Sequence, residues 1–287
     1  MQSLDLIKKR IKSIEATRKI TNAMKLVATT KIKSQSKSFE AVSIFCHEYY
    51  RVFKALILRE PNLDFLRLPN KKVQDQDLYI LCTSDLGLCG PFNNTICKFL
   101  MSKIRPQDKI LVFGQKGVSY LKLHRMGDQI IKTMRWDLDA NNYYALLPLS
   151  YEILSAYATG KYKNIKVVYT EFKSTVSSAP KMWNILPIWP ELFGATKEVQ
   201  VRDWTIFEPS AKDIIKAILP VYVSNLVYGA LVESTLCEST SRRFAMEGAT
   251  KNATELIDTL RIQYNQARQE AITQEINEIV AGATEKK

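Results

Sequence analysis

The chain has 287 residues, 46% of them hydrophobic, and a formal net charge of +12, which suits one large or two modest domains with a real core. It has no run of 18 apolar residues and no apolar block behind its N-terminal charges, so we expect neither a membrane span nor a signal or transit peptide. Two histidines, and five cysteines without a CxxC spacing, predict no metal, no cofactor and no disulfide framework.

Residues 1–60 contain neither glycine nor proline. Two groups of apolar residues recur there at the spacing of a coiled-coil seam, Leu4, Ile7, Ile11 and Ile14 and then, after a shift, Ile20, Met24 and Val27. This spacing is typical of a helix that pairs with another helix. We therefore expect an N-terminal coiled-coil helix over residues 1–60.

The same segment is strongly basic. Between Lys8 and Lys37 there are ten Lys or Arg residues and one acid, Glu15. Such a charge attracts an anionic partner, which can be nucleic acid, acidic lipid or an acidic protein surface, or it can simply be a solvated helix face. No aromatic residues interleave with the charges and no nucleic-acid-binding motif is present, so we expect no nucleic-acid partner. A coiled-coil scaffold and a basic nucleic-acid binder remain the alternatives from other classes.

The middle of the chain has a different pattern of residue types. Short apolar, β-branched runs at 77–85, 109–114 and 165–172 predict buried strands, and helix-like stretches at 93–103, 116–125 and 151–159 lie among them. This alternation predicts right-handed βαβ units with a mostly parallel sheet, a Rossmann-like α/β domain over residues 72–205. Residues 180–190 are interpreted as a loop or edge region, with Trp183 and Trp189 packed against the domain.

Residues 208–287 predict a second long helix. No proline follows Pro220, and one face carries a stripe of apolar and small residues, namely Met246, Ala249, Ala253, Leu256, Leu260, Tyr264 and Ala267. We expect a break at most near Gly229 or Gly248. Because neither terminal helix can bury its stripe alone, the predicted fold is α/β, with an antiparallel coiled coil of the N- and C-terminal helices and a Rossmann-like domain between them.

Two turns after strands were considered as chemical sites. The sequence GQKG at 114–117 lacks the spacing of a phosphate-binding loop and indicates a tight strand-to-helix connection. The sequence TSDLGLCG at 83–90 has no nucleophile elbow. There we expect Asp85 to cap, Gly87 and Gly90 to adopt positive φ, and Cys89 to be buried. No catalytic residue is predicted.

Several blocks of the sequence, in order, resemble the gamma subunit of F-type ATP synthases. They are IKKRIKSIEATRKITNAMKLVATTKIK (7–33), SDLGLCGPFN (84–93), GQKG, FEPSAKDIIKAILPVYVSNLVYGALVES (207–234) and ARQEAITQEINEIVAGA (267–283). The resemblance extends along almost the full length. It implies a non-catalytic central rotor shaft, present in one copy, inside a hexamer of alpha- and beta-type nucleotide-binding subunits. It further implies an epsilon-type subunit and a membrane rotor ring as partners, at the cytoplasmic face of a membrane.

The resemblance also implies interface residues. Positions that match the family's contacts with the catalytic subunits are Met24, Lys25, Arg268, Gln269, Thr273 and Glu275. In this frame the basic segment faces an acidic protein surface, and the C-terminal helix is the end of the shaft that enters the ring.

The turn Ser84, Asp85, Leu86, Gly87, Cys89 and Pro91 matches the foot of that family, with two departures. Leu86 stands where the family has arginine, and Pro91 stands where it has glycine. Leu86 removes a charge, and Pro91 removes a hydrogen-bond donor and fixes φ. The departures leave open a gamma-like shaft whose rotation drives work other than ATP synthesis.

Overall fold

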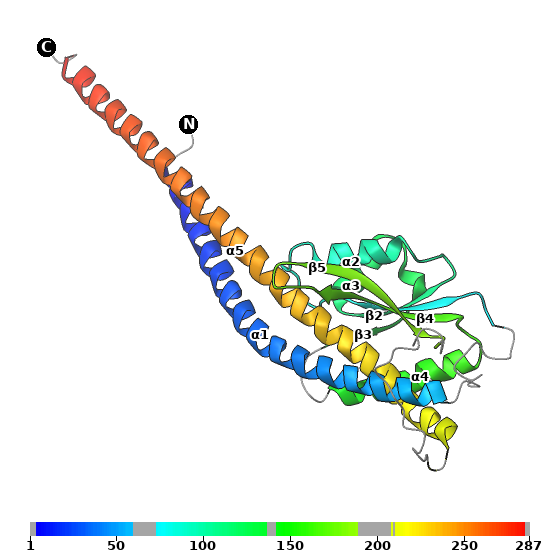
Figure 1. The fold of residues 1–287 in the computed structure, drawn as a ribbon. Helices are drawn as coiled ribbons and strands as arrows, with labels where there is room; N and C mark the ends of the chain where they lie inside the picture. The colour runs from blue at the N-terminus through cyan, green and yellow to red at the C-terminus, as the bar shows by residue number, and fades with distance from the viewer. Residues whose placement is uncertain (1–3, 60–72, 137–141, 189–207, 209, 285–287) are drawn as a thin grey trace. The chain divides into compact units, whose positions relative to one another are not determined.

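The computed structural model describes residues 4–59, 73–136, 142–188, 208 and 210–284 (Figure 1). The chain forms two compact units. The helical unit is Met1–Thr30 with Arg242–Lys287, and the foot unit is Lys31–Ser241. Two long helices, α1 (Leu4–Arg59) and α5 (Ala211–Thr284), contribute to both units. The predicted domain limits at 60, 72 and 205 lie outside the described residues, and the division into 1–60, 72–205 and 208–287 stays a prediction.

In the helical unit the start of α1 and the end of α5 run antiparallel, side by side, and α5 continues beyond the start of α1 (Figure 1). The side chains at the seam follow unbroken heptads on both helices, and a few neighbours, such as Glu15 and Met24 on α1, are half-buried beside the seam. On α1 the seam residues are Leu4, Ile7, Ile11, Ile14, Arg18, Thr21, Lys25 and Ala28. On α5 they are Met246, Thr250, Ala253, Ile257, Leu260, Tyr264, Ala267 and Ala271. The predicted antiparallel pairing of the terminal helices is confirmed.

The predicted shift in the seam of α1 is wrong. Ile20 is 61% exposed and Val27 is 56% exposed, because the heptad continues from Ile14 through polar and small residues instead. Thr21 faces Thr250, with their hydroxyl oxygens 2.8 Å apart, so short side chains and a hydrogen bond occupy the seam. On α5, likewise, Ile257 is buried where Leu256 was expected. A prediction based on hydrophobicity alone assigns the large apolar side chains to the seam. Close packing of the two helices instead places small side chains there.

A double cysteine variant tests this register. Because the Thr21 and Thr250 hydroxyls touch, Thr21→Cys with Thr250→Cys is expected to form a disulfide under mild oxidation, detected as a cross-linked peptide by mass spectrometry. The matched pair Ile20→Cys with Thr250→Cys should stay reduced, since Ile20 points outward. Equal cross-linking of both pairs would show that the seam slips.

The foot unit contains a five-stranded sheet in the order β3-β2-β1-β4-β5. The strands are β1 (Asp77–Cys82), β2 (Lys109–Phe113), β3 (Ile130–Met134), β4 (Asn164–Phe172) and β5 (Ser178–Leu186). The first four strands of this order pair in parallel, and β5 pairs antiparallel with β4. The mostly parallel sheet is therefore confirmed.

Helices cover both faces of the sheet. The helices α2 (Phe92–Met101) and α3 (Gln115–Leu123) pack on one face, around Leu81, Val112 and Ile96. The helix α4 (Asn142–Ala158) and the foot segments of α1 and α5 pack on the other, around Ile80, Phe53 and Val223. A short 3₁₀ turn, η2 (Gly127–Gln129), precedes β3. Burial on both faces explains why the central strands are uninterrupted apolar runs.

Three local expectations need correction. The strand β3 was missed, because it lies at the sheet edge and its side chains are only partly buried. The helix α4 begins at Asn142 rather than near 151 and carries Pro148 inside it. β5 is an edge strand, but Trp183 on it is exposed rather than packed, and Trp189 lies outside the described residues. In addition, α5 continues through Gly229 and Gly248 without a break.

Within the described residues, one helix is long and apolar enough by composition to cross a membrane. It is α5, where an 18-residue window reaches a mean hydropathy of 1.6, and half of that window is buried in the structure. A core helix of a globular unit passes the same test. Here the apolar side chains of α5 pack against the sheet, with Ile215, Val223 and Leu231 almost fully shielded.

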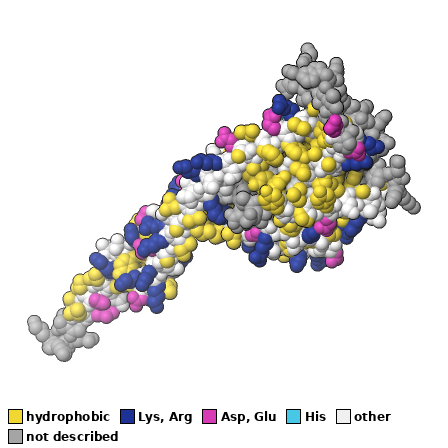
Figure 2. All heavy atoms as spheres, turned by 90° about the horizontal axis from the view of Figure 1, so that it is seen from below, with side chains coloured by type: hydrophobic (Ala, Val, Ile, Leu, Met, Phe, Trp, Pro, Cys, Tyr) yellow, Lys and Arg dark blue, Asp and Glu magenta, His cyan; other side chains and the backbone are white. Residues whose placement is uncertain are grey.

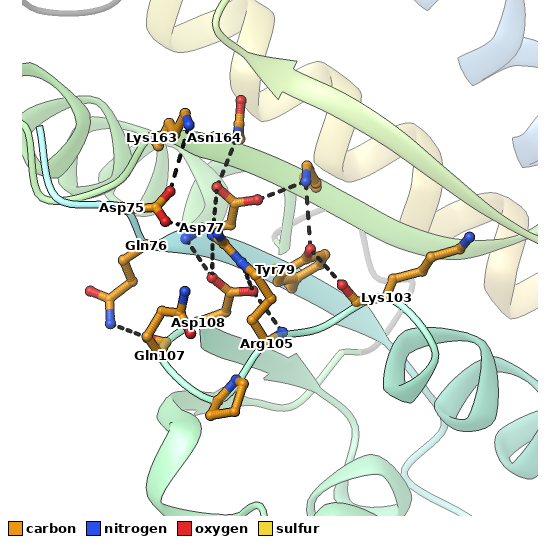
Figure 3. A network of polar contacts seen from close by, with 12 residues as sticks. Asp75, Gln76, Asp77, Tyr79, Lys103, Arg105, Gln107, Asp108, Lys163 and Asn164 are labelled. Carbon is orange, nitrogen blue, oxygen red and sulfur yellow. Dashed lines mark hydrogen bonds and ion pairs between the residues drawn. The ribbon is translucent and has the colours of Figure 1, made fainter.

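A polar cluster closes the amino-terminal edge of the sheet (Figure 3). Asp108 is fully buried and accepts hydrogen bonds from the Asp77 backbone N–H at 2.9 Å and from Arg105 Nη2 at 2.9 Å. Asp77 in turn accepts from Asn164 Nδ2 at 2.8 Å and pairs with Lys166 Nζ at 2.7 Å. The cluster thus ties the starts of β1, β2 and β4 together.

We expect Asp108→Ala to destabilise the foot unit by about 2–4 kcal/mol, because the buried N–H groups that bond Asp108 lose their acceptor. Urea unfolding followed by circular dichroism measures this loss. Asp75→Ala is the control, since Asp75 reaches the same guanidinium at 3.1 Å but is solvent-exposed, and it should leave the midpoint almost unchanged. Equal effects of both changes would contradict a structural role for Asp108.

Candidate functional site

The side chains at the C-terminal end of the helical unit are exposed as far as the structure describes them. Ala271 is the last half-buried residue of α5, and every side chain from Ile272 to Val280 is exposed. Ile272, Ile276 and Ile279 recur at helical spacing and therefore form one apolar face. An apolar helix face without a partner marks a surface that another molecule covers.

The predicted interface residues of α5 lie on this end. Arg268 and Glu275 are exposed and, by their spacing, flank the isoleucine face. Gln269 and Thr273 lie on the neighbouring polar face, where the Thr273 hydroxyl donates to the Gln269 carbonyl at 2.9 Å. That face forms a shallow hollow lined by Gln266, Gln269, Glu270, Thr273, Gln274 and Asn277. Amide and hydroxyl groups of this kind suit hydrogen bonding to loops of a partner protein.

Met24 and Lys25 lie elsewhere in the helical unit. Both are half-buried on α1, and the Thr21–Thr250 contact places them level with the region of Met246 on α5. At 1.5 Å per residue, this is roughly 30 Å along the helix from Arg268. The structure therefore does not bring the six predicted residues into one site. It places them at two levels of the helical unit, which suits contacts with different parts of a long partner surface.

Basic side chains stand along the helical unit (Figure 2). On α1, Lys8, Lys9, Arg10, Lys12 and Lys19 are exposed. One acid, Glu15, pairs across the helices with Arg261 at 3.1 Å. The positive charge of these five side chains therefore lies on the solvent-exposed surface of the helical unit.

The predicted foot turn lies at the carboxyl edge of the sheet, directly after β1. Asn93 on α2 holds it, because its Oδ1 accepts from the Ser84 backbone N–H at 3.0 Å and its Nδ2 donates to Ser84 Oγ at 2.7 Å. Asp85 Oδ1 accepts from the first N–H of α3, that of Gln115, at 3.0 Å. Asp85 therefore caps a helix as expected.

The backbone of the turn differs from the expectation at one glycine. Gly90 has φ 57°, as predicted, but the other residue with positive φ is Leu88, at 61°, not Gly87. Cys89 is buried beside Cys237, and its carbonyl accepts from the Ser241 hydroxyl of α5 at 2.7 Å. The hydrogen bond to Ser241 holds the end of the turn, and Leu86 lies at the tip of the turn, where it is 68% exposed, with Leu88 exposed beside it. Burial raises the pKa of Cys237 to about 12, so its thiol is unreactive.

Pro91 has a local explanation. It directly precedes α2, and its carbonyl accepts from the Thr95 backbone N–H at 2.9 Å. The first N–H groups of a helix have no partner within the helix, so a proline at this start removes a donor that the helix does not use. Nothing in the structure of the chain alone explains the leucine at position 86.

Sequence reasoning missed the isoleucine face of α5 and the role of Asn93. The signal for the first was present, since Ile272, Ile276 and Ile279 recur at helical spacing in the sequence. Asn93 gave no comparable signal, because its contacts depend on how α2 packs against β1. Among the described residues, no group of three or more His, Cys, Asp or Glu is arranged to hold a metal ion.

Comparison with known protein sequences matches this chain to ATP synthase proteins along almost its full length. The family model described as ATP synthase matches residues 3–284. The ATP synthase gamma chain of Ureaplasma parvum is 36% identical over 286 residues, which cover 98% of this chain and 99% of that protein. The ATP synthase gamma chain of Malacoplasma penetrans is 38% identical over 290 residues, covering 99% of each.

Solved structures share the fold. A chain of the Euglena gracilis mitochondrial ATP synthase OSCP/F1/c-ring structure aligns with TM-score 0.67 at 18% identity, covering 98% of this chain and 93% of that one. A chain of the Tetrahymena thermophila mitochondrial ATP synthase central stalk/c-ring structure aligns with TM-score 0.62 at 24% identity, covering 80% and 99%. Together with the full-length sequence matches, these findings show that the chain belongs to the ATP synthase gamma chain family.

Proposed function

We propose that this chain is the central rotor subunit of a rotary F-type ATP synthase. One observation carries the proposal: a chain that matches gamma chains over residues 3–284 ends in a helix whose side chains from 272 to 280 are all exposed. A helix end with an apolar face and a polar face, both uncovered, is suited to enter a surrounding partner. The solved relatives come from central stalk and F1/c-ring assemblies.

The mechanism follows from symmetry. A single, asymmetric shaft inside a ring of three catalytic and three non-catalytic subunits contacts the three catalytic subunits differently. Each contact favours a different conformation, and hence a different nucleotide affinity, by the differential free energy of that contact. Rotation of the shaft then exchanges the three states in sequence. The chain itself transfers no phosphate in this scheme, because the nucleotides bind to the ring.

The interface residues fit this scheme as two levels of contact. Arg268, Gln269, Thr273 and Glu275 are proposed to bind loops of the catalytic subunits near the end of α5. Met24 and Lys25 are proposed to face an acidic loop of the same subunits further along. The exposed Leu86 tip is proposed to contact the epsilon-type subunit or the membrane rotor ring, with one copy of this chain per complex, at the cytoplasmic face of the membrane.

Purification of the tagged, full-length chain from its native cells, followed by mass spectrometry, tests the proposal. We expect a hexamer of alpha- and beta-type nucleotide-binding subunits together with a membrane rotor ring and stator. Recovery of the hexamer with other proteins and without a rotor ring would instead assign the shaft to a different rotary ATPase. Recovery of nucleic acid or of a homodimer alone would contradict the rotor role.

A further inference from the structure

A cavity of about 510 Å³, partly open to solvent, lies in the foot unit. Its walls come from the foot segment of α1, from β4 and β5, and from α5, all within Lys31–Ser241. This volume lies in the range of sites that hold small organic molecules. The proposed rotor function assigns no role to it.

The walls are mainly apolar and rich in aromatic rings. Phe39 and Tyr50 come from α1, Tyr169 from β4 and Trp183 from β5. On α5, Gly229 lines the cavity opposite Cys46, where an added Cβ would lie 3.5 Å from the sulfur. The absence of a side chain at Gly229 therefore keeps part of this space open. Aromatic walls of this kind favour a flat aromatic ligand, through stacked and edge-on contacts.

One buried polar group in the wall has no partner. Asn225 is 3% exposed, and its Oδ1 accepts from the Tyr143 hydroxyl at 2.8 Å, but its Nδ2 has no hydrogen-bond partner. An unpaired buried amide costs free energy, and Nδ2 is shielded in this structure, so a ligand that supplies an acceptor gains this hydrogen bond once the Asn225 side chain turns toward the cavity.

The charges at the cavity disfavour an anion. Lys181 is paired with Glu171, so this cation is already neutralised. Glu233 also lines the cavity and accepts from the Phe172 backbone N–H at 2.8 Å. Burial raises the pKa of Glu233, which shows that its surroundings tolerate negative charge poorly. A second negative charge would be repelled and desolvated together with it.

We infer that this cavity binds an uncharged aromatic molecule that carries a carbonyl oxygen, with the ring between the aromatic walls and the oxygen accepting from Asn225. The size, the aromatic lining, the unpaired donor and the pairing of Lys181 with Glu171 together select this class of ligand. Binding at this position bridges α1, the sheet edge and α5 within the foot unit, and so stabilises that unit.

The uncharged naphthalene ketone prodan is a suitable probe, because its emission shifts to the blue in apolar surroundings and it accepts energy from tryptophan. With the full-length chain, we expect saturable binding with a blue shift and quenching of Trp183. Gly229→Leu should weaken binding at least tenfold by filling the cavity. Gly248→Leu makes the same change in the same helix where nothing lies within 4 Å, and should leave binding unchanged.

The hydrogen bond is tested separately. Asn225→Leu keeps the volume and removes the donor, and is expected to weaken prodan binding about three- to tenfold. Tyr143→Phe removes only the partner of Asn225 Oδ1 and should change binding less than twofold. Circular dichroism confirms that each variant is folded. No saturable binding by the wild-type chain would mean that water alone meets Asn225, and would overturn the inference. So would equal binding by the Gly229→Leu variant or by the Asn225→Leu variant.

Discussion

Replacing Gly114 with alanine is expected to destabilise the foot unit by about 3 kcal/mol or more, from strain and overpacking together. Gly114 has φ 95°, a conformation that residues with a Cβ rarely adopt, and it joins β2 to α3. An added Cβ would lie 2.3 Å from the Thr83 carbonyl oxygen and 2.6 Å from its carbonyl carbon. These are backbone atoms at the end of β1, so relief requires the two strand ends to separate.

The consequence reaches the foot turn. Thr83 immediately precedes Ser84, and its hydroxyl donates to the Phe113 carbonyl at 2.7 Å and accepts from the Gly117 N–H at 3.0 Å. Displacing Thr83 breaks this connection between β1, β2 and α3. We therefore expect Gly114→Ala to lower the urea midpoint of the foot unit and to release the Leu86 tip from its fixed position, measured by proteolysis within residues 84–91.

The matched control is Gly248→Ala. Gly248 lies within α5, where nothing occurs within 4 Å of an added Cβ. Alanine is a better helix former than glycine, so this change should stabilise by about 0.5–1 kcal/mol. Opposite signs for the same substitution at two glycines are the expected result. A tolerated Gly114→Ala variant would mean that the β2–α3 connection is built differently.

The architecture could be predicted because long helices and buried strands are indicated by patterns within short stretches of the sequence. Apolar runs such as 109–114 and 165–172 are long enough to identify buried strands, and a proline-free, glycine-free stretch of sixty residues permits little besides a helix. The weakest strand, β3, was missed for the same physical reason, since an edge strand with partly exposed side chains lacks a continuous apolar run.

Positions that depend on partners could not be predicted. The seam of α1 uses Thr21 because the facing helix offers Thr250 within hydrogen-bonding distance, and no property of α1 alone reveals this. Similarly, Leu88 rather than Gly87 adopts positive φ because Asn93 and Ser241 fix the ends of the turn. The interface residues themselves came from resemblance, and the structure adds where they lie, not what they bind.

Removing residues 272–287 is expected to uncouple the shaft from its ring while leaving both units folded. From Ile272 to Val280 every side chain of α5 is exposed, so the truncation removes little packing from the chain, although it does remove the hydrogen bond from the Thr273 hydroxyl to the Gln269 carbonyl. The unfolding transition should stay within a degree or two, and the Thr21→Cys/Thr250→Cys cross-link should still form. In the assembled complex, in contrast, ATP-driven rotation and ATP synthesis should fall severalfold, because the truncation removes the contacts proposed between the end of the shaft and the catalytic subunits.

A second variant separates the length of the helix from its surface. Changing Ile272, Ile276 and Ile279 together to alanine keeps the helix, since alanine is the best helix former, but removes the large apolar side chains. If the apolar face supports the shaft within the ring, this variant should reproduce most of the loss seen on truncation. If length alone matters, the alanine variant should rotate normally and only the truncation should fail. Unchanged rotation and unchanged stability of the complex in both variants would show that the exposed end of α5 bears no load, and that torque passes through the level of Met24 and Lys25 instead.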